Sequence, residues 1–213
     1  MSLKINKSQL DQKTRIRTKL ELDIRRKEFI EICILLDSLN IRYFLLGGIL
    51  LGAIRNNDFI PWDWDVEICV LSEDVYNNKL LLKKINDSHF KIIKQDNNLL
   101  SFKLDLLGKL AKEVSCYTIM GWNHDKQKEI FWRKNFKVPE HFLLNMTKIK
   151  LFDKFHYAPY PPEDYLTHQY GDWKTPIQTS DKDIYLSKEY YQYSKSKELL
   201  KNILKYFKNF FNK

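Results

Sequence analysis

Apolar residues recur at spacings of three and four between residues 20 and 39, which is the period of an amphipathic helix. The residues on this stripe are Leu22, Phe29, Ile32, Cys33 and Leu36. The basic run 25–27 lies mostly off the stripe. We expect Asn40 to end the helix and residues 42–46 to form a strand that stops at the pair Gly47-Gly48. Residues 48–55 then fit a helix or a turn.

Helices and strands continue to alternate further along the chain. Ser72, followed by two acidic residues, is a typical helix start, and this helix is expected to reach about Asn86. Strands are expected over 90–94, 100–107 and 113–120, the last two forming a hairpin, and residues 121–125 are expected to form a turn. Pro161 or Pro162 begins another helix. This pattern predicts an α/β or α+β fold with a small mixed sheet flanked by helices.

The last residues, 195–213, form a separate feature. Lys197, Lys201, Lys205 and Lys208 lie on one side of a predicted helix, and leucine, isoleucine and phenylalanine side chains lie on the other. Such a basic amphipathic helix either binds an anionic membrane surface or packs on its own domain or a second copy. Residues 1–194 are expected to form one domain.

The composition indicates the charge of a binding partner and the cellular compartment of the protein. The chain has 213 residues and a net charge of +9, which favours a negative partner such as a nucleotide, an anionic glycan or a membrane leaflet. Its three cysteines are widely spaced in apolar surroundings, which is neither a disulfide framework nor a zinc motif. With no continuous apolar signal segment or membrane span, the protein is expected to be cytoplasmic, with peripheral binding to the inner face of the membrane as an option.

Three carboxylates follow the glycine pair at intervals of two residues. Asp63, Asp65 and Glu67 alternate with Trp64, Val66 and Ile68. If residues 63–69 are extended, the carboxylates share one face of a strand. A cation between them would relieve their repulsion, and hard oxygen ligands suit Mg²⁺ or Mn²⁺. The plain structural alternative is a buried hairpin with a solvated acidic tip.

The glycines and a nearby arginine suit a phosphate. Gly47 and Gly48 have no Cβ, so the backbone there can approach a ligand closely. Arg55 lies between the glycines and the carboxylates and can contact a phosphate through two hydrogen bonds. A salt bridge from Arg55 to Asp58 or Asp63 is the alternative.

The string Gly-Gly-x-Leu-Leu-Gly-Ala-Ile-Arg, followed by Phe-Ile-Pro-Trp-Asp-x-Asp-x-Glu, is far more specific than a glycine pair before an acidic strand. It resembles the LicD and fukutin-related family of phosphotransferases, which have a nucleotidyltransferase-type fold. A Tyr-Gly-Asp-Trp segment at residues 170–173, followed by Pro176, extends the resemblance over about residues 29–176. Tyr170 and Trp173 are expected to pack in the core and Asp172 to cap a turn.

The resemblance implies a CDP-linked donor, such as one carrying phosphocholine or ribitol phosphate. The phospho-alcohol would pass to a hydroxyl of a cell-surface glycan or teichoic acid, and CMP would leave. A lipid-linked glycan is one option for the acceptor. Asp65 and Glu67 would bind the metal with help from Asp63, Gly47 and Gly48 would hold the diphosphate, and Arg55 would neutralise it. Nucleic acid is not expected as a partner.

The third carboxylate departs from the family pattern. Relatives have an aspartate on the second strand of the hairpin, and Ser115 is the nearest match to that position. Asp105 or Glu113 is the candidate third ligand and general base, with Asp63 as a substitute. Two other functions stay open: transfer of a whole nucleotide to a small molecule or nucleic acid end, and an inactive binding module in glycan assembly.

Overall fold

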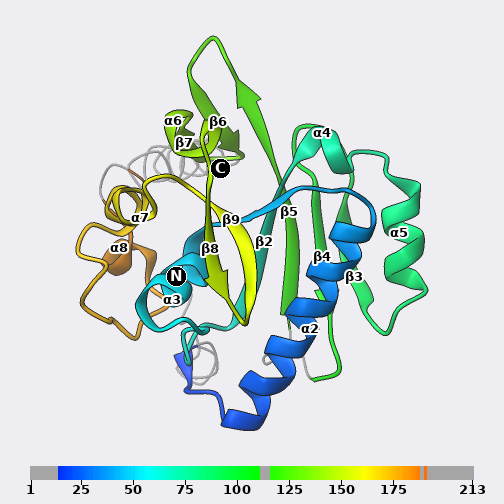
Figure 1. The fold of residues 1–213 in the computed structure, drawn as a ribbon, viewed down its shortest axis with the longest axis horizontal. Helices are drawn as coiled ribbons and strands as arrows, with labels where there is room; N and C mark the ends of the chain where they lie inside the picture. The colour runs from blue at the N-terminus through cyan, green and yellow to red at the C-terminus, as the bar shows by residue number, and fades with distance from the viewer. Residues whose placement is uncertain (1–13, 111–115, 188–189, 191–213) are drawn as a thin grey trace, which may run out of the picture.

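The computed structural model describes residues 14–110, 116–187 and 190. Within them the main sheet has the strand order β3-β4-β5-β2-β1-β9-β8, and a small extension pairs β6 with β5 and β7. The strands are β1 (Tyr43–Leu45), β2 (Asp65–Leu71), β3 (Lys91–Asp96), β4 (Lys103–Leu107), β5 (Cys116–Asp125), β6 (Ile130–Arg133), β7 (Phe136–Pro139), β8 (Thr147–Leu151) and β9 (Lys154–Ala158). Figure 1 shows the helices around this sheet, so the predicted mixed sheet flanked by helices is confirmed.

The helices differ widely in length. They are α2 (Lys19–Ser38), α3 (Gly47–Asn56), α4 (Ser72–Val75), α5 (Lys79–Asn86), α6 (His141–Leu144), α7 (Pro162–Tyr170) and α8 (Lys182–Tyr185). The longest, α2, lies across the β4–β5 part of the sheet in Figure 1. It begins with a capping box, in which Thr18 accepts a hydrogen bond from the backbone of Glu21 and the Glu21 carboxylate accepts one in return. The predicted helix over 20–39 is confirmed.

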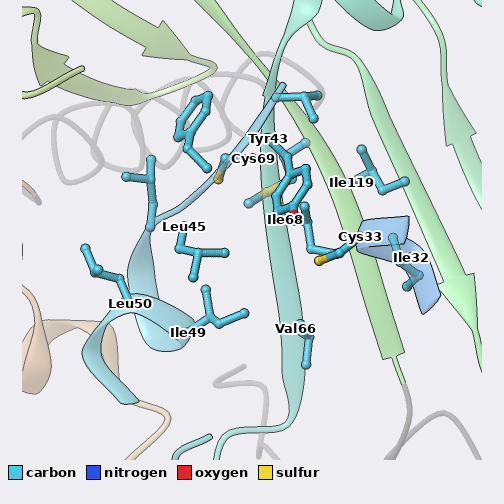
Figure 2. Packing of buried hydrophobic residues seen from close by; sticks show 14 of the residues in the cluster. Ile32, Cys33, Tyr43, Leu45, Ile49, Leu50, Val66, Ile68, Cys69 and Ile119 are labelled. Carbon is cyan, nitrogen blue, oxygen red and sulfur yellow. The ribbon is translucent and has the colours of Figure 1, made fainter. Parts of the chain in front are cut away.

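The core joins α2 to the centre of the sheet. The predicted stripe residues Phe29, Ile32, Cys33 and Leu36 are at most 1% exposed. They belong to the same cluster as Val66 and Ile68 of β2, and Figure 2 shows part of this packing. All three cysteines are buried and free, so the expectation that they form no disulfide framework is confirmed.

β2 is the central element of the site because it has two different faces. It pairs in parallel with β5 and antiparallel with β1. Val66, Ile68 and Val70 are at most 1% exposed and point into the core, while the alternate positions Asp65 and Glu67 stay partly exposed on the other face. The sheet thus places two carboxylates where a pocket opens.

Three local predictions are wrong. Residues 72–86 form two helices instead of one, because the chain turns at Asn77, which has a positive φ of 55°. Ser72 does not cap a helix through its side chain; it is 1% exposed, and Asn78 caps α5 instead. Residues 121–125 are no turn but the continuation of β5, whose last residues pair with β6.

The remaining predictions concern the hairpin, the proline-initiated helix and the tail. β4 and β5 pair antiparallel as expected. α7 begins at Pro162 after Pro161, with Glu163 and Asp164 in its first turn. No helix in the described part of the chain is both long and apolar enough to cross a membrane. The predicted helix over 195–213 lies outside the described residues, and the boundary at residue 194 stays a prediction.

Candidate functional site

The three predicted carboxylates lie at the start of β2 and in the loop before it. β2 begins at Asp65, so Asp63 and Trp64 are not part of the strand as predicted. Asp63 still reaches the glycine turn: a Cβ added to Gly48 would lie 2.1 Å from its Oδ2 atom. Loop and strand therefore both bring carboxylates to the beginning of α3.

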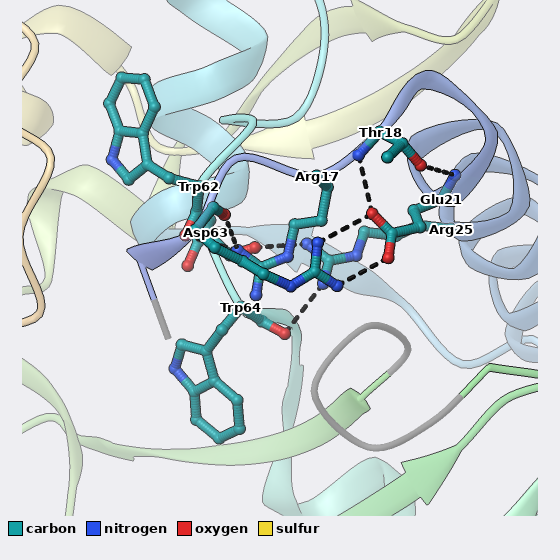
Figure 3. A network of polar contacts seen from close by, with 8 residues as sticks. Arg17, Thr18, Glu21, Arg25, Trp62, Asp63 and Trp64 are labelled. Carbon is teal, nitrogen blue, oxygen red and sulfur yellow. Dashed lines mark hydrogen bonds and ion pairs between the residues drawn. The ribbon is translucent and has the colours of Figure 1, made fainter. Parts of the chain in front are cut away.

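Buried arginines hold the loop that carries Asp63. Arg25 of α2, 1% exposed, donates hydrogen bonds to the backbone carbonyls of Asp63 (2.6 Å) and Trp64 (2.9 Å). Arg17 donates to the carbonyl of Trp62 at 2.8 Å, and Figure 3 shows the whole network. The position of Arg25 off the apolar stripe had given no sign of burial. The guanidinium of Arg25 donates its hydrogen bonds to carbonyls of the acidic loop. These bonds pair a buried charge and two carbonyl groups that would be costly to leave unpaired.

The glycine pair begins α3 beside the carboxylates. Gly47 has a φ of +62°, which disfavours other residues. The carboxylate of Glu67 and the hydroxyl of Tyr170 each lie 3.8 Å from where a Cβ on Gly47 would be. Leu46, the N-cap residue of α3, makes no capping hydrogen bond with its side chain, so in the described part of the chain the first backbone N–H groups of the helix suit an anion. This geometry suits the phosphate-type turn that the sequence predicts, and the binding of a phosphate there stays a prediction.

Burial and mutual repulsion change the acidity of all three carboxyls. Burial, and then the charge of Glu67, raise the pKa of Asp63 to about 6, although the nearby Arg25 acts in the opposite direction. The pKa of Asp65 is raised well above its usual range by burial and by the charges of Glu67 and Asp63. Burial also raises the pKa of Glu67. A cation would relieve this unfavourable concentration of negative charge.

The carboxylates suit a hard divalent cation that takes two protein ligands and completes its coordination with water and phosphate. Within the described residues, no three His, Cys, Asp or Glu side chains lie close enough together to bind one metal ion. Mg²⁺ commonly takes only one or two carboxylates and completes its coordination with water and substrate phosphate. Asp65 and Glu67, two residues apart on one strand face, suit that requirement.

The carboxylates line a pocket of about 580 Å³ with residues from distant parts of the chain. Among them are several residues that no sequence pattern had assigned to this site: Lys103, Arg133, Gln169, Tyr170 and Lys182. Tyr170 was expected only to pack in the core, but its hydroxyl lies at the glycine turn. The Tyr-Gly-Asp-Trp segment at residues 170–173, through its resemblance to the family, was the signal in the sequence that pointed to this part of the chain. Trp173, 8% exposed, does pack in the core as predicted.

Arg55 lines the same pocket but is already engaged. Its Nη2 atom donates hydrogen bonds to the backbone carbonyls of Trp173 and Thr175. The alternative salt bridge to Asp58 or Asp63 is wrong, since Asp58 pairs with Arg26 at 2.9 Å. Arg55 thus ties α3 to the segment after α7, where Asp172 accepts a hydrogen bond from Thr175 and caps the turn as predicted.

Of the two candidates for a third carboxylate, Asp105 lies in the described part of the chain and Glu113 does not. Asp105 shares a row across the sheet with Thr118 and Glu67, because these residues are paired in register. Its oxygens accept hydrogen bonds from Lys103 and Thr118, both at 2.7 Å. Burial raises its pKa, but these contacts outweigh burial and lower it overall. Glu113 and Ser115 lie outside the described residues, and both catalytic assignments stay predictions.

A mixed sheet with paired carboxylates facing a glycine turn at a helix start is the arrangement of a nucleotidyltransferase-type domain. The sequence model of the LicD/FKTN/FKRP nucleotidyltransferase domain matches residues 40–161, more than half of the chain. The chain therefore belongs to the LicD/FKTN/FKRP family, as the resemblance predicted.

Individual relatives match over shorter or weaker stretches. A segment of 42 residues, 20% of this chain, is 52% identical to the ribitol 5-phosphate transferase FKRP of mouse and of human, and covers 8% of those proteins. An uncharacterized protein of Rickettsia prowazekii is 27% identical over 146 residues, which make up 65% of this chain and 51% of the relative. The match thus spans about half of the Rickettsia relative and a small part of the FKRP proteins.

Proposed function

We propose that this protein transfers a phospho-alcohol from a CDP-linked donor to a hydroxyl of a cell-surface glycan, with release of CMP. The observation that carries the proposal is the meeting of an uncapped helix start at Gly47 with the carboxylates of Asp63 and Glu67 in one pocket. Family membership and the name of the FKRP relatives, ribitol 5-phosphate transferase, support the class of group transferred.

In this proposal, different residues of the pocket bind the metal ion, bind the donor's diphosphate and hold the pocket wall in place. Asp65 and Glu67 would bind Mg²⁺ or Mn²⁺, and the bound ion would neutralise charge on the reacting phosphate. Gly47 and Gly48 leave the first N–H groups of α3 open to the donor's diphosphate. Arg55 does not neutralise that diphosphate in this proposal; it fixes the pocket wall through the Trp173 and Thr175 carbonyls.

The proton of the acceptor hydroxyl needs a base near the reacting phosphorus. The hydroxyl oxygen forms a bond to the donor phosphorus linked to the alcohol, and the bond from that phosphorus to the oxygen of the CMP phosphate breaks. Asp63 is the candidate base because its carboxylate lies at the glycine turn, and burial raises its pKa to about 6 in the metal-free protein. Asp105 suits it less, since Lys103 and Thr118 already occupy its oxygens.

Product analysis tests the reaction directly. We expect the protein to release CMP from CDP-choline or a CDP-polyol when Mg²⁺ and a hydroxyl acceptor are present. Asp65→Asn and Glu67→Gln should each lower the rate about 100-fold or more while circular dichroism stays unchanged. Asp153→Asn is the matched control, because the side chain of Asp153 is 95% exposed and distant from β2 in sequence. Wild-type rates in both site variants would refute the metal assignment.

The name of the family domain also favours a second candidate, transfer of a whole nucleotide. In that reaction a nucleoside triphosphate would release pyrophosphate, and CDP-linked donors would not react. A binding module without activity would release neither product but would still be stabilised by a ligand in a thermal-shift screen with Mg²⁺. Chromatography of the products therefore separates the three functions.

A further inference from the structure

Arg133, the last residue of β6, is a buried cation with unused hydrogen-bonding capacity. It is only 5% exposed and lines the pocket. Its Nε and Nη2 atoms have no hydrogen-bond partner in the described part of the chain. Buried donors are nearly always paired, and leaving a charged one unpaired is costly. An arginine in this state indicates a ligand that supplies the missing acceptors.

Arg133 lies near the acidic cluster without touching it. Among the charges that act on Glu67, that of Arg133 has the largest effect. Yet in residues 14–110 and 116–187 no carboxylate oxygen lies within 4.0 Å of its guanidinium, the distance of an ion pair. The guanidinium and the carboxylates therefore face the same pocket with space between them. An anion there would be attracted by Arg133 and by a cation held on β2.

Two other cations that line the pocket, Lys103 and Lys182, make contacts of their own. Lys103 forms an ion pair with Asp105 at 2.6 Å, and the Lys182 ammonium lies 5.6 Å from the centre of the Phe136 ring. They add positive potential, since both also act on Glu67. Arg133 differs because Nε and Nη2 lie on one edge of a planar guanidinium. Two parallel N–H bonds from that edge fit two oxygens of a phosphate.

We infer that Arg133 binds a phosphate group of a substrate through Nε and Nη2 and so positions it against the β2 carboxylates. The inference rests on the proposed function for the role of that phosphate, but the anion site itself is defined by the pocket. Two sources share this chemistry: the diphosphate of the donor, and a phosphate already present on the acceptor. The geometry of β6 makes Arg133 a binding residue that the acidic motif alone does not reveal.

The anion site can be tested without any turnover. Inorganic pyrophosphate with Mg²⁺ serves as the probe, and calorimetry measures its affinity for the full chain. We expect Arg133→Gln to weaken binding at least tenfold and Arg133→Lys, which keeps the charge but loses the planar edge, at least threefold. Arg42→Gln is the control, since Arg42 is exposed just before β1 and should bind as wild type does. Wild-type affinity in Arg133→Gln would overturn the inference.

Arg133→Lys keeps the inference testable if Arg133→Gln does not fold. If Arg133→Gln does not fold, Arg133→Lys decides the question alone, and an affinity within twofold of wild type would refute the role of the guanidinium edge. For folded variants, the melting temperature without ligand should stay close to that of wild type. A purely structural arginine would instead lower the melting temperature and leave the affinity of the folded protein unchanged.

Steady-state kinetics then identify the source of the phosphate. A raised KM for the CDP-linked donor in Arg133→Lys points to the donor diphosphate, and a raised KM for the acceptor alone points to an acceptor phosphate. If pyrophosphate binding depends on Arg133 but no CDP-linked donor reacts, the proposed function fails and the anion site stands. If turnover occurs and Arg133 variants have wild-type KM values and affinity, only the present inference fails.

Discussion

Replacing Asp63 with asparagine should stabilise the metal-free protein, and the gain should depend on pH. Asp63 is crowded by Glu67 and buried, so its pKa is raised from 3.8 to about 6. The folded state therefore keeps a proton that the unfolded state loses, and stability falls as pH rises from about 3.8 to 6. Asparagine has nearly the same shape but no charge, and the backbone carbonyl that Arg25 binds is unchanged.

The size of the effect follows from the same pKa. Each pKa unit corresponds to about 1.4 kcal/mol, so the two states differ by about 3 kcal/mol at neutral pH. Asp63 keeps part of its surface in the open pocket, where water screens its charge. We therefore expect Asp63→Asn to raise the free energy of unfolding by about 1–3 kcal/mol above pH 6.5 and by nearly nothing at pH 4.

Urea unfolding in the presence of a chelator measures this difference at pH 4, 5, 6 and 7.5. Asp153→Asn is the control, because its carboxylate is almost fully exposed and should give a small, pH-independent change. Adding Mg²⁺ at pH 7.5 should stabilise wild type more than Asp63→Asn. A variant that is equally or less stable than wild type at pH 7.5, or a difference that does not change with pH, would refute the reasoning about the acidic cluster.

Three further outcomes are expected. Gly48→Ala should lower turnover at least tenfold, because the new Cβ would lie 2.1 Å from the Asp63 carboxylate and displace it; an unchanged rate would contradict the close approach. Arg25→Gln should lower the free energy of unfolding by about 2–4 kcal/mol in urea titrations, since two partly buried carbonyls lose a charged, buried donor, and a loss under 0.5 kcal/mol would contradict this. Asp105→Asn should change Mn²⁺ affinity less than threefold in calorimetry, as Lys103 and Thr118 occupy its oxygens; a tenfold loss would make it a metal ligand.

Local patterns predicted a helix over 20–39, which the structure shows as α2, and the strand that carries Asp65 and Glu67, because both depend on residue spacing. The apolar stripe of α2 has the helical period, and the alternation in β2 has the strand period. The acidic residues could be placed on one face for the same reason. Asp63 was misplaced in the strand because its position depends on Arg25, a contact between residues 38 positions apart.

The rest of the site depends on contacts that no local pattern contains. Arg133 and Tyr170 reach the pocket only because β6 extends from the end of β5 and α7 packs against α3. The position of Arg133 could not be predicted, because residues 121–125 were expected to form a turn. They instead continue β5, and β6 pairs with this continuation. Arg55 had the right position in the sequence for a phosphate ligand, but the Trp173 and Thr175 carbonyls, more than 110 residues away, engage it.

The contact of Arg25 with the acidic loop has a consequence for how variants of this protein are interpreted. Residues 40–161 match the family domain, yet the side chain that holds Asp63 and Trp64 in place comes from α2, outside that range. We expect a shortened chain that begins at residue 40 to keep Asp63, Asp65 and Glu67 but to lose the arginine that holds the loop of Asp63 in place. We expect a substitution at Arg25 to lower activity as an active-site change does, although its hydrogen bonds to this loop go to the backbone carbonyls of Asp63 and Trp64. Screens that rank variants by their distance from the acidic motif would overlook this position.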